Sequence, residues 1–136
     1  NSPLETWNSV STRFGGNFEC HYEPKPLRLL RASSKEEGKI IIHLTMYGEK
    51  IEDIIDSIPK DKSTIIVVGG TKVPGEVYGL ADYNISIGNQ PHSEVSALAI
   101  FLNNFVNPNS LKNKFSGAQI KVLPSKKGKS ILSIDD

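Results

Sequence analysis

The sequence predicts an α/β fold with a mainly parallel sheet flanked by helices. Apolar, β-branched runs typical of buried parallel strands alternate along the chain with segments whose apolar residues recur at helical spacing. Three of the predicted strands also end in polar or glycine-containing loops that lead into a helix, the arrangement of βα units. With 136 residues and 38% hydrophobic content, we expect one domain over 1–136 with a core of its own.

The N-terminal region is predicted to hold a helix, a strand and a short helix. The helix over 4–14 has apolar residues at helical spacing and ends at a glycine pair; these residues are Leu4, Trp7, Val10, Phe14, Gly15 and Gly16. Residues 18–23 alternate with period two, which predicts a half-buried strand with Cys20 on its apolar face and His21 on its polar face. Residues 27–31 fit a short helix before the next strand.

The central region repeats one unit of strand, turn and helix. Its predicted elements are, in order, strand 39–44, turn 45–48, helix 51–58, strand 64–68, turn 69–72, helix 74–81, strand 83–87 and helix 94–106. The helix over 51–58 rests on an i, i+3, i+4, i+7 spacing of isoleucines and ends before Pro59. This order predicts helices on both faces of the sheet.

The C-terminal region differs from the rest in pattern and in charge. Segments 117–123 and 130–134 look like two strands of a hairpin, and we expect them to form a peripheral extension over about 117–136. Residues 95–134 contain no acid and six lysines, namely Lys112, Lys114, Lys121, Lys126, Lys127 and Lys129. Such a basic segment is compatible with binding a polyanion, and equally with a solvated lysine face.

The composition excludes several classes of protein. The single cysteine excludes an internal disulfide, and the sequence contains no apolar run long enough to span a membrane and no signal-peptide pattern. The expected setting is the cytoplasm, without membrane association. We expect no metal site, because Cys20, His21, His43 and His92 do not follow a recognised ligand spacing.

The loops at the ends of the predicted strands form the default ligand site. They begin HLTMYG at 43–48, VVGGTKVPG at 67–75 and SIGNQPHSE at 86–94. In open parallel sheets, ligands bind at the carboxyl ends of the strands. The sequence contains no G-x-G-x-x-G fingerprint, and GGTKVPG lacks the P-loop spacing, so dinucleotide and P-loop sites are not favoured.

Several polar residues in the third loop have more than one interpretation. Ser93 and Glu94 are well placed to cap the following helix and to interact with its dipole. Asn89 and Gln90 either shape a binding loop or satisfy backbone groups. His92 is either a general base or a supporting residue, and Lys72 in the second loop either meets an anionic ligand or lies in solvent.

The helix over 94–106 is apolar nearly all round. One stripe contains Val95, Leu98, Leu102 and Phe105, and the opposite side carries Ala97, Ile100 and Phe101. Such a helix must bury both faces, either within the fold or against a second subunit.

Three motifs together resemble the archaeal tRNA (cytidine-56-2′-O)-methyltransferases, a family of the SPOUT (SpoU–TrmD) class. They are HLTMYG at 43–48, GG-x-KVP at 69–74, and GNQPHSE at 88–94 with its alanine-rich helix. The similarity extends from about residue 13 to the lysine-rich end. It implies an α/β domain with a C-terminal deep trefoil knot, a topology that periodicity alone could not suggest, and a homodimer. The implied substrate is tRNA.

The resemblance also implies a site for S-adenosyl-L-methionine in these three loops. The corresponding cofactor-binding residues are Leu44, Gly69, Gly70, Thr71, Lys72, Val73, Ile87, Gly88, Asn89, Gln90, Pro91, His92, Ser93 and Glu94. We assign no catalytic residue. Family members begin with a further strand and a loop whose arginine is thought to help activate the 2′-hydroxyl, and we expect that motif to be absent from this chain. A non-catalytic knotted RNA-binding or assembly module is therefore the alternative function.

Overall fold

The computed structural model describes residues 2–69, 72–106 and 115–134. The chain divides into two compact units, each described by itself below. Unit 1 combines the two ends of the chain, residues 1–24 and 112–136, and unit 2 comprises residues 25–111. A single domain over 1–136 stays a prediction.

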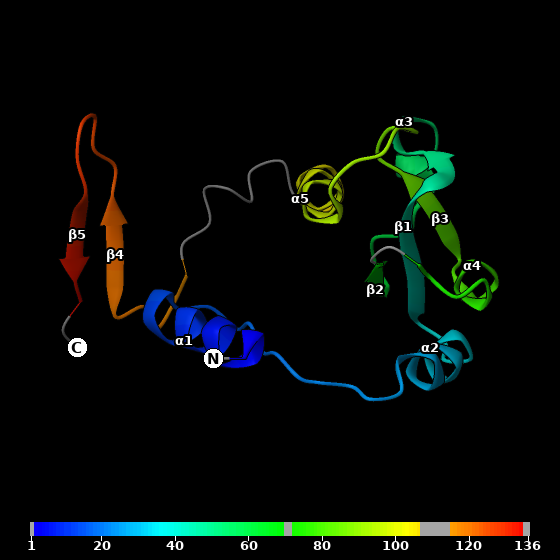
Figure 1. Cartoon of the computed structure of the whole chain (residues 1–136), viewed down its shortest axis with the longest axis horizontal. Coiled ribbons are helices and arrows are strands. Elements are labelled where there is room, and N and C mark those ends of the chain that lie inside the picture. The colour runs from blue at the N-terminus through cyan, green and yellow to red at the C-terminus, as the bar shows by residue number, and fades with distance from the viewer. Residues whose placement is uncertain (1, 70–71, 107–114, 135–136) are drawn as a thin grey trace. The chain divides into compact units, whose positions relative to one another are not determined.

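Unit 2 is built on a three-stranded parallel sheet (Figure 1). The strands are β1 (Lys39–Lys50), β2 (Ser63–Val68) and β3 (Tyr83–Ser86), arranged in the order β2-β1-β3. β1 is the central strand: Ile41 lies opposite Ile65 of β2, and Ile42 lies opposite Tyr83 of β3. The prediction of an α/β fold with a parallel sheet is confirmed for this unit.

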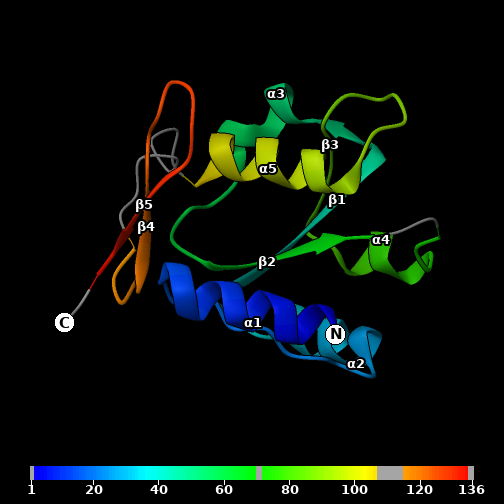
Figure 2. The ribbon, with the colours of Figure 1, turned by 60° about the vertical axis from the view of Figure 1, so that its left-hand side comes forward.

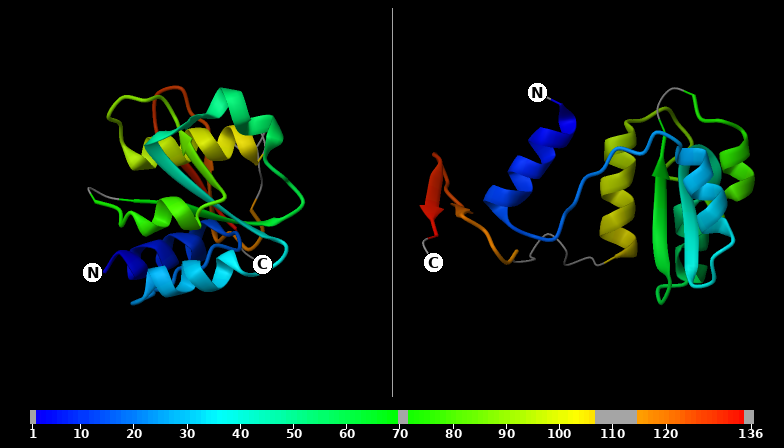
Figure 3. Two further views of the ribbon diagram at one scale, coloured as in Figure 1. Left: turned by 90° about the vertical axis from the view of Figure 1, so that its right-hand side faces the viewer. Right: turned by 90° about the horizontal axis from the view of Figure 1, so that it is seen from below.

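Helices cover both faces of this sheet (Figures 2 and 3). On one face, α2 (Pro26–Ser34) and α4 (Glu76–Leu80) pack through Leu30 and Val77 against Ile41. On the other face, α3 (Ile51–Ile54), the 3-10 helix η1 (Ile55–Ser57) and α5 (Glu94–Phe105) lie over Ile40 and Ile42. Because neighbouring side chains of a strand point to opposite faces, the run 40–42 feeds both apolar clusters.

The predicted turn at 45–48 is wrong, because β1 continues to Lys50. Its register with β3 shifts between Leu44 and Glu49, and both of these residues lie opposite Ile85. A Cβ atom on Gly48 would lie 2.5 Å from the carbonyl carbon and oxygen of Asn84, so only glycine allows this close approach. Residues 45–48, here called the β1 bulge, therefore stay within the strand while shifting its register.

The helix after β1 begins at Ile51 as predicted, but its α-helical part ends earlier than predicted. The predicted helix over 51–58 consists of α3 and one 3-10 turn, and Ile58 is buried just beyond them.

The start of α5 agrees with the prediction, and its buried residues come from both of the predicted apolar sides. The Ser93 hydroxyl accepts a hydrogen bond from the backbone N–H of Ser96 at 3.3 Å, as an N-cap should. The buried side chains are Ala97, Phe101 and Phe105, whereas Val95 is 78% exposed. Phe105 belongs to the predicted stripe over 95, 98, 102 and 105, and Ala97 and Phe101 belong to the opposite side, so both sides contribute buried residues.

Within unit 1, α1 (Pro3–Phe14) is followed by a turn at Gly15, which has a φ angle of +83°. The strands β4 (Ile120–Leu123) and β5 (Ser130–Ser133) form the predicted antiparallel hairpin. The backbone N–H of Gln119 donates to Arg13 O at 2.8 Å, and that of Gly16 donates to Ser116 O at 3.0 Å. Backbone hydrogen bonds thus join the two ends of the chain.

The predicted strand over 18–23 is wrong. These residues have no regular secondary structure, and Phe18 and Tyr22 are exposed. Among the described residues no strand pairs with this segment, so alternation alone did not produce a strand.

Candidate functional site

The topology of unit 2 opens a crevice at the carboxyl ends of its strands. The chain leaves β1 toward α3 on one face and leaves β2 toward α4 on the opposite face. Adjacent parallel strands whose connections diverge in this way leave room between them for a ligand. The loop after β3 leads into α5, whose first turns also reach this edge of the sheet.

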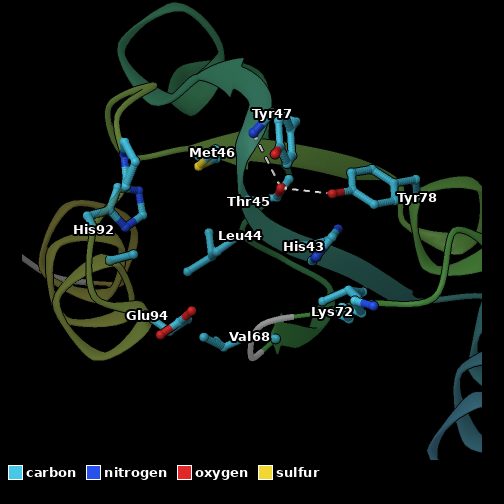
Figure 4. Close-up of a pocket in the computed structure, with 14 residues that line it drawn as sticks. His43, Leu44, Thr45, Met46, Tyr47, Val68, Lys72, Tyr78, His92 and Glu94 are labelled. Carbon is cyan, nitrogen blue, oxygen red and sulfur yellow. Dashed lines mark hydrogen bonds between the residues drawn. The ribbon is translucent and has the colours of Figure 1, made fainter.

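A cavity of about 550 Å³ occupies this position (Figure 4). Its lining comes from β1 and the β1 bulge, the end of β2 and its loop, α4, the third loop and the start of α5. The lining residues are His43, Leu44, Thr45, Met46, Tyr47, Val68, Gly69, Lys72, Val73, Tyr78, Pro91, His92, Glu94 and Ala97. The site predicted from the loops therefore coincides with a cavity of the size that small-molecule ligands occupy.

His43 is the buried polar group of the lining. Its side chain is 1% exposed, and Nδ1 lies 2.9 Å from Asn84 Oδ1. The Asn84 amide nitrogen donates to Tyr78 O at 3.0 Å, which leaves Oδ1 as the acceptor. His43 Nδ1 must therefore carry a hydrogen and donate a hydrogen bond to Asn84 Oδ1, and this bond fixes the orientation of the ring.

Tyr78 links this buried pair to the β1 bulge. Its ring packs edge-on against His43, with centroids 4.8 Å apart at 80°. Its hydroxyl lies 3.1 Å from Thr45 Oγ1, which also accepts the backbone N–H of Tyr47 at 3.3 Å. Figure 4 shows Thr45, Tyr78 and His43 on the side of the cavity away from His92 and Glu94. One hydrogen-bonded set from β1, α4 and β3 thus supports this wall of the cavity.

Asn89 connects the third loop to the β1 bulge. Its side-chain amide donates to Met46 O at 2.8 Å and lies 3.5 Å from Gly48 O. Of the two interpretations open from the sequence, the structure places this amide on backbone carbonyls. Asn89 therefore fixes the loop that carries Pro91 and His92 to the cavity.

The structure brings together half of the predicted cofactor-binding residues. Seven line the cavity: Leu44, Gly69, Lys72, Val73, Pro91, His92 and Glu94. Five others, Ile87, Gly88, Asn89, Gln90 and Ser93, belong to the third loop or the helix cap and do not line it. Gly70 and Thr71 lie outside the described residues.

His92 and Lys72 differ from His43 in their surroundings. Both are exposed, and His92 Nδ1 lies 3.3 Å from the backbone oxygen of its neighbour Ser93. Figure 4 shows His92 and Glu94 on the α5 side of the cavity and Lys72 on the β2 side. The rim therefore carries groups of both charges that a polar ligand can meet.

Sequence reasoning missed seven residues of the lining, namely His43, Thr45, Met46, Tyr47, Val68, Tyr78 and Ala97. Four of them belong to the HLTMYG motif, from which only Leu44 was selected, so the motif itself was the available signal. No sequence motif indicated Tyr78, because this residue joins the site only through the contacts of α4 with β1 and β3.

No group of three or more histidine, cysteine, aspartate or glutamate residues among the described residues is arranged to hold a metal ion. No helix in the same residues has the length and apolar character needed to cross a membrane.

Comparison with known proteins places this geometry in context. Residues 14–132 match a family described as tRNA ribose 2′-O-methyltransferase, aTrm56. The tRNA (cytidine(56)-2′-O)-methyltransferase of Thermococcus kodakarensis is 44% identical over 135 residues, which cover 96% of this chain and 74% of that protein. The enzyme of the same name from Methanocaldococcus jannaschii is 48% identical, with 90% and 69% covered. The enzyme of the same name from Methanocorpusculum labreanum is 46% identical, and the match covers 90% of this chain and 66% of that protein.

Proposed function

Because the chain belongs to the tRNA ribose 2′-O-methyltransferase family, we propose that it methylates the ribose 2′-hydroxyl of cytidine 56 in the TΨC loop of tRNA. The resemblance predicted from the three loop motifs is confirmed by the family match and by archaeal relatives. The family implies a methyl donor, and we propose that the donor is S-adenosyl-L-methionine. The observation that carries the proposal is the cavity at the strand ends, lined by half of the residues predicted for the cofactor.

The residues of the cavity fit this cofactor. Leu44, Val68 and Ala97 offer apolar surface to the adenine ring and the methionine chain. Lys72 and Glu94 at the rim are opposite in charge to the carboxylate and the ammonium group of the methionine moiety. A Cβ atom on Gly69 would overlap Cγ2 of Val73, so the glycine lets Val73 pack directly against the backbone of this loop.

Bound S-adenosyl-L-methionine supplies a methyl group on a positively charged sulfur. The contribution of the chain is to hold and orient the reactants, and alignment alone can contribute much of a rate enhancement. The His43–Asn84–Tyr78 set fixes one wall of the cavity, and Asn89 fixes the third loop. No residue is assigned as the acceptor of the ribose proton.

We propose that lysines near the C-terminus contact the phosphate backbone of the tRNA. In the described segment 115–134, four lysines and no acid are present, and the lysines are Lys121, Lys126, Lys127 and Lys129. Contacts of this kind give an affinity that falls with salt and depends little on sequence. Lys112 and Lys114 lie outside the described residues.

We further propose a homodimer and, from the SPOUT resemblance, a C-terminal trefoil knot. The dimer is supported by apolar residues of α5 that remain exposed beside its buried face, Val95, Ile100 and Leu102. Light scattering of wild type and Ile100→Lys tests the proposed dimer: a dimeric wild type and a monomeric variant are expected, and a monomeric wild type contradicts the proposal.

A protein that modifies tRNA is expected in the cytoplasm.

Mass spectrometry of an unmodified tRNA transcript tests the activity. After incubation with the protein and isotopically labelled S-adenosyl-L-methionine, we expect one labelled methyl group on the ribose of cytidine 56. A methyl group on a base contradicts the assigned chemistry. RNA binding without any methyl transfer, by a protein that also fails to bind the cofactor in calorimetry, favours the non-catalytic RNA-binding module.

A further inference from the structure

Tyr47 is an aromatic residue that the folding of unit 2 does not explain. Its side chain is 76% exposed, although it lines the cavity. The other two tyrosines of the unit, Tyr78 and Tyr83, are partly buried and pack within it. A ring left in water adds little to the hydrophobic stabilisation of the fold. Its position at the mouth of the cavity therefore requires another reason.

The backbone under this ring is held firmly. The N–H of Tyr47 donates to Thr45 Oγ1, and Thr45 pairs with the Tyr78 hydroxyl, whose ring packs against buried His43. On the other side, Gly48 lies against the backbone of β3 and Asn89 holds the carbonyl of Met46. The ring thus projects from a segment that is fixed at both of its ends.

An exposed aromatic ring on a firmly held segment suits an unpaired nucleobase. Sequence-specific and structure-specific RNA recognition commonly uses splayed bases that stack on aromatic side chains. The ribose that is to be methylated must come to the mouth of a cavity that holds the methyl donor, so an RNA base must lie near that mouth. From these observations, and resting on the proposed function, we infer that Tyr47 is a stacking platform for an unpaired base of the RNA substrate.

Fluorescence gives a direct test, because the chain contains a single tryptophan. Tyr47→Trp is made in a Trp7→Phe background, so that the new indole is the only one. Adding an unmodified tRNA transcript is expected to quench its emission, since a stacked base contacts the ring. Tyr22→Trp in the same background is the matched control: Tyr22 is 79% exposed in unit 1, whose proposed RNA contacts are to phosphate and not to bases, so we expect much weaker quenching there.

Affinity measurements separate stacking from other roles. Tyr47→Leu keeps an apolar side chain and removes the ring, and we expect it to weaken tRNA binding roughly 10- to 100-fold. Tyr47→Phe is expected to restore most of the affinity, because stacking needs the ring and not the hydroxyl. The affinity of Tyr47→Leu for S-adenosyl-L-methionine should fall by much less than its affinity for tRNA.

Three outcomes would overturn the inference. The first is wild-type tRNA affinity in Tyr47→Leu, and the second is a parallel loss of cofactor affinity, which would assign the ring to the cofactor. The third is a Tyr47→Trp emission that depends on protein concentration without RNA, which would assign the ring to a second copy of the chain. If the wild type binds tRNA but transfers no methyl group, the proposed function fails while the stacking is still measured.

Discussion

The two units of the chain differ in the contacts that stabilise each of them. All of the buried hydrophobic side chains in the described residues belong to unit 2, where all but Ala97 form two clusters on the two faces of the sheet. In unit 1, α1 buries no residue, and its contacts with the C-terminal segment include the backbone hydrogen bonds of Gly16 and Gln119. The cavity lies wholly in unit 2. A precise site thus coincides with the packed part of the chain, which can hold side chains in fixed positions.

The largest effect is expected from the core of unit 2. Phe101 is fully buried and stacks on Phe105 with centroids 5.1 Å apart, so Phe101→Ala should lower the free energy of unfolding by about 3–5 kcal/mol. The matched control is Phe18→Ala, because Phe18 of unit 1 is 58% exposed and should change stability by less than about 0.5 kcal/mol. Urea unfolding measures both, and equal losses would contradict the contrast between the units.

Two glycines, one in each unit, test whether a steric clash in the backbone disturbs the cofactor site only when it lies in unit 2. Gly48→Ala places a Cβ 2.5 Å from the β3 backbone, and Gly15→Ala places one 2.6 Å from Ser116 O at a φ of +83°. Each should cost about 1–3 kcal/mol of stability. Only Gly48→Ala should also weaken cofactor binding, by about tenfold or 1.4 kcal/mol.

Calorimetry with S-adenosyl-L-methionine, at a temperature where both variants are folded, measures whether the Gly48 and Gly15 variants differ in cofactor affinity. Gly79→Ala is the control for a glycine-to-alanine change without a steric clash, because nothing lies within 4 Å of its added Cβ in α4. Alanine should stabilise this helix by about 0.5–1 kcal/mol. Equal cofactor affinity in the Gly48 and Gly15 variants would show that the β1 bulge does not shape the site.

A smaller effect is expected from the amide of Asn89. Asn89→Ala removes the hydrogen bond to Met46 O and should weaken cofactor binding by about 0.5–1.5 kcal/mol, because the third loop loses its tie to the β1 bulge. Asn104→Ala removes a similar bond, to Ile100 O at 2.9 Å on α5, and should leave that affinity unchanged. A comparable loss in both variants would assign the effect to general destabilisation.

The smallest effect concerns the ion pair between α2 and α4. Arg31 donates twice to the Glu76 carboxylate, from Nε and from a terminal nitrogen, each at 2.6 Å. The hydrogen bond from Arg31 holds the pKa of Glu76 below its ordinary value. The unfolded chain therefore binds the proton more readily, and the pair stabilises the fold above the unfolded-state pKa. That contribution disappears as the pH falls through the lowered pKa of the folded state.

Thermal unfolding of wild type and Glu76→Gln across the acidic range checks this sign. The stability difference between them should be present near neutral pH and shrink as the solution becomes acidic. Because both side chains are partly exposed, the difference should also fall with added salt. A difference that grows on acidification would contradict the assigned direction.

The sequence predicted the elements of unit 2 well and their details less well. The isoleucine and valine runs indicated the strands, because parallel strands buried on both faces need continuous apolar residues. The TMYG segment looked like a turn, since only its contact with β3, more than 30 residues later, keeps it in the strand. The alternation at 18–23 failed for a related reason, because a strand requires a partner that local pattern does not specify.

The candidate site shows the same division. Its three loops were predictable, because motifs at strand ends are local in sequence. The buried set of His43, Asn84 and Tyr78 was not, because its hydrogen bonds join residues up to 41 positions apart on three elements. Nothing in the local pattern around Tyr78 indicated that its hydroxyl would meet Thr45.

Hydrogen–deuterium exchange with and without S-adenosyl-L-methionine tests the central claim most directly, namely that the strand-end cavity of unit 2 is the cofactor site. The account predicts added protection in peptides that cover 43–50 and 87–97, and none in peptides that cover 3–14 and 118–134. Saturating cofactor that protects only the unit 1 peptides, or that leaves the exchange of 43–50 and 87–97 unchanged, would contradict it.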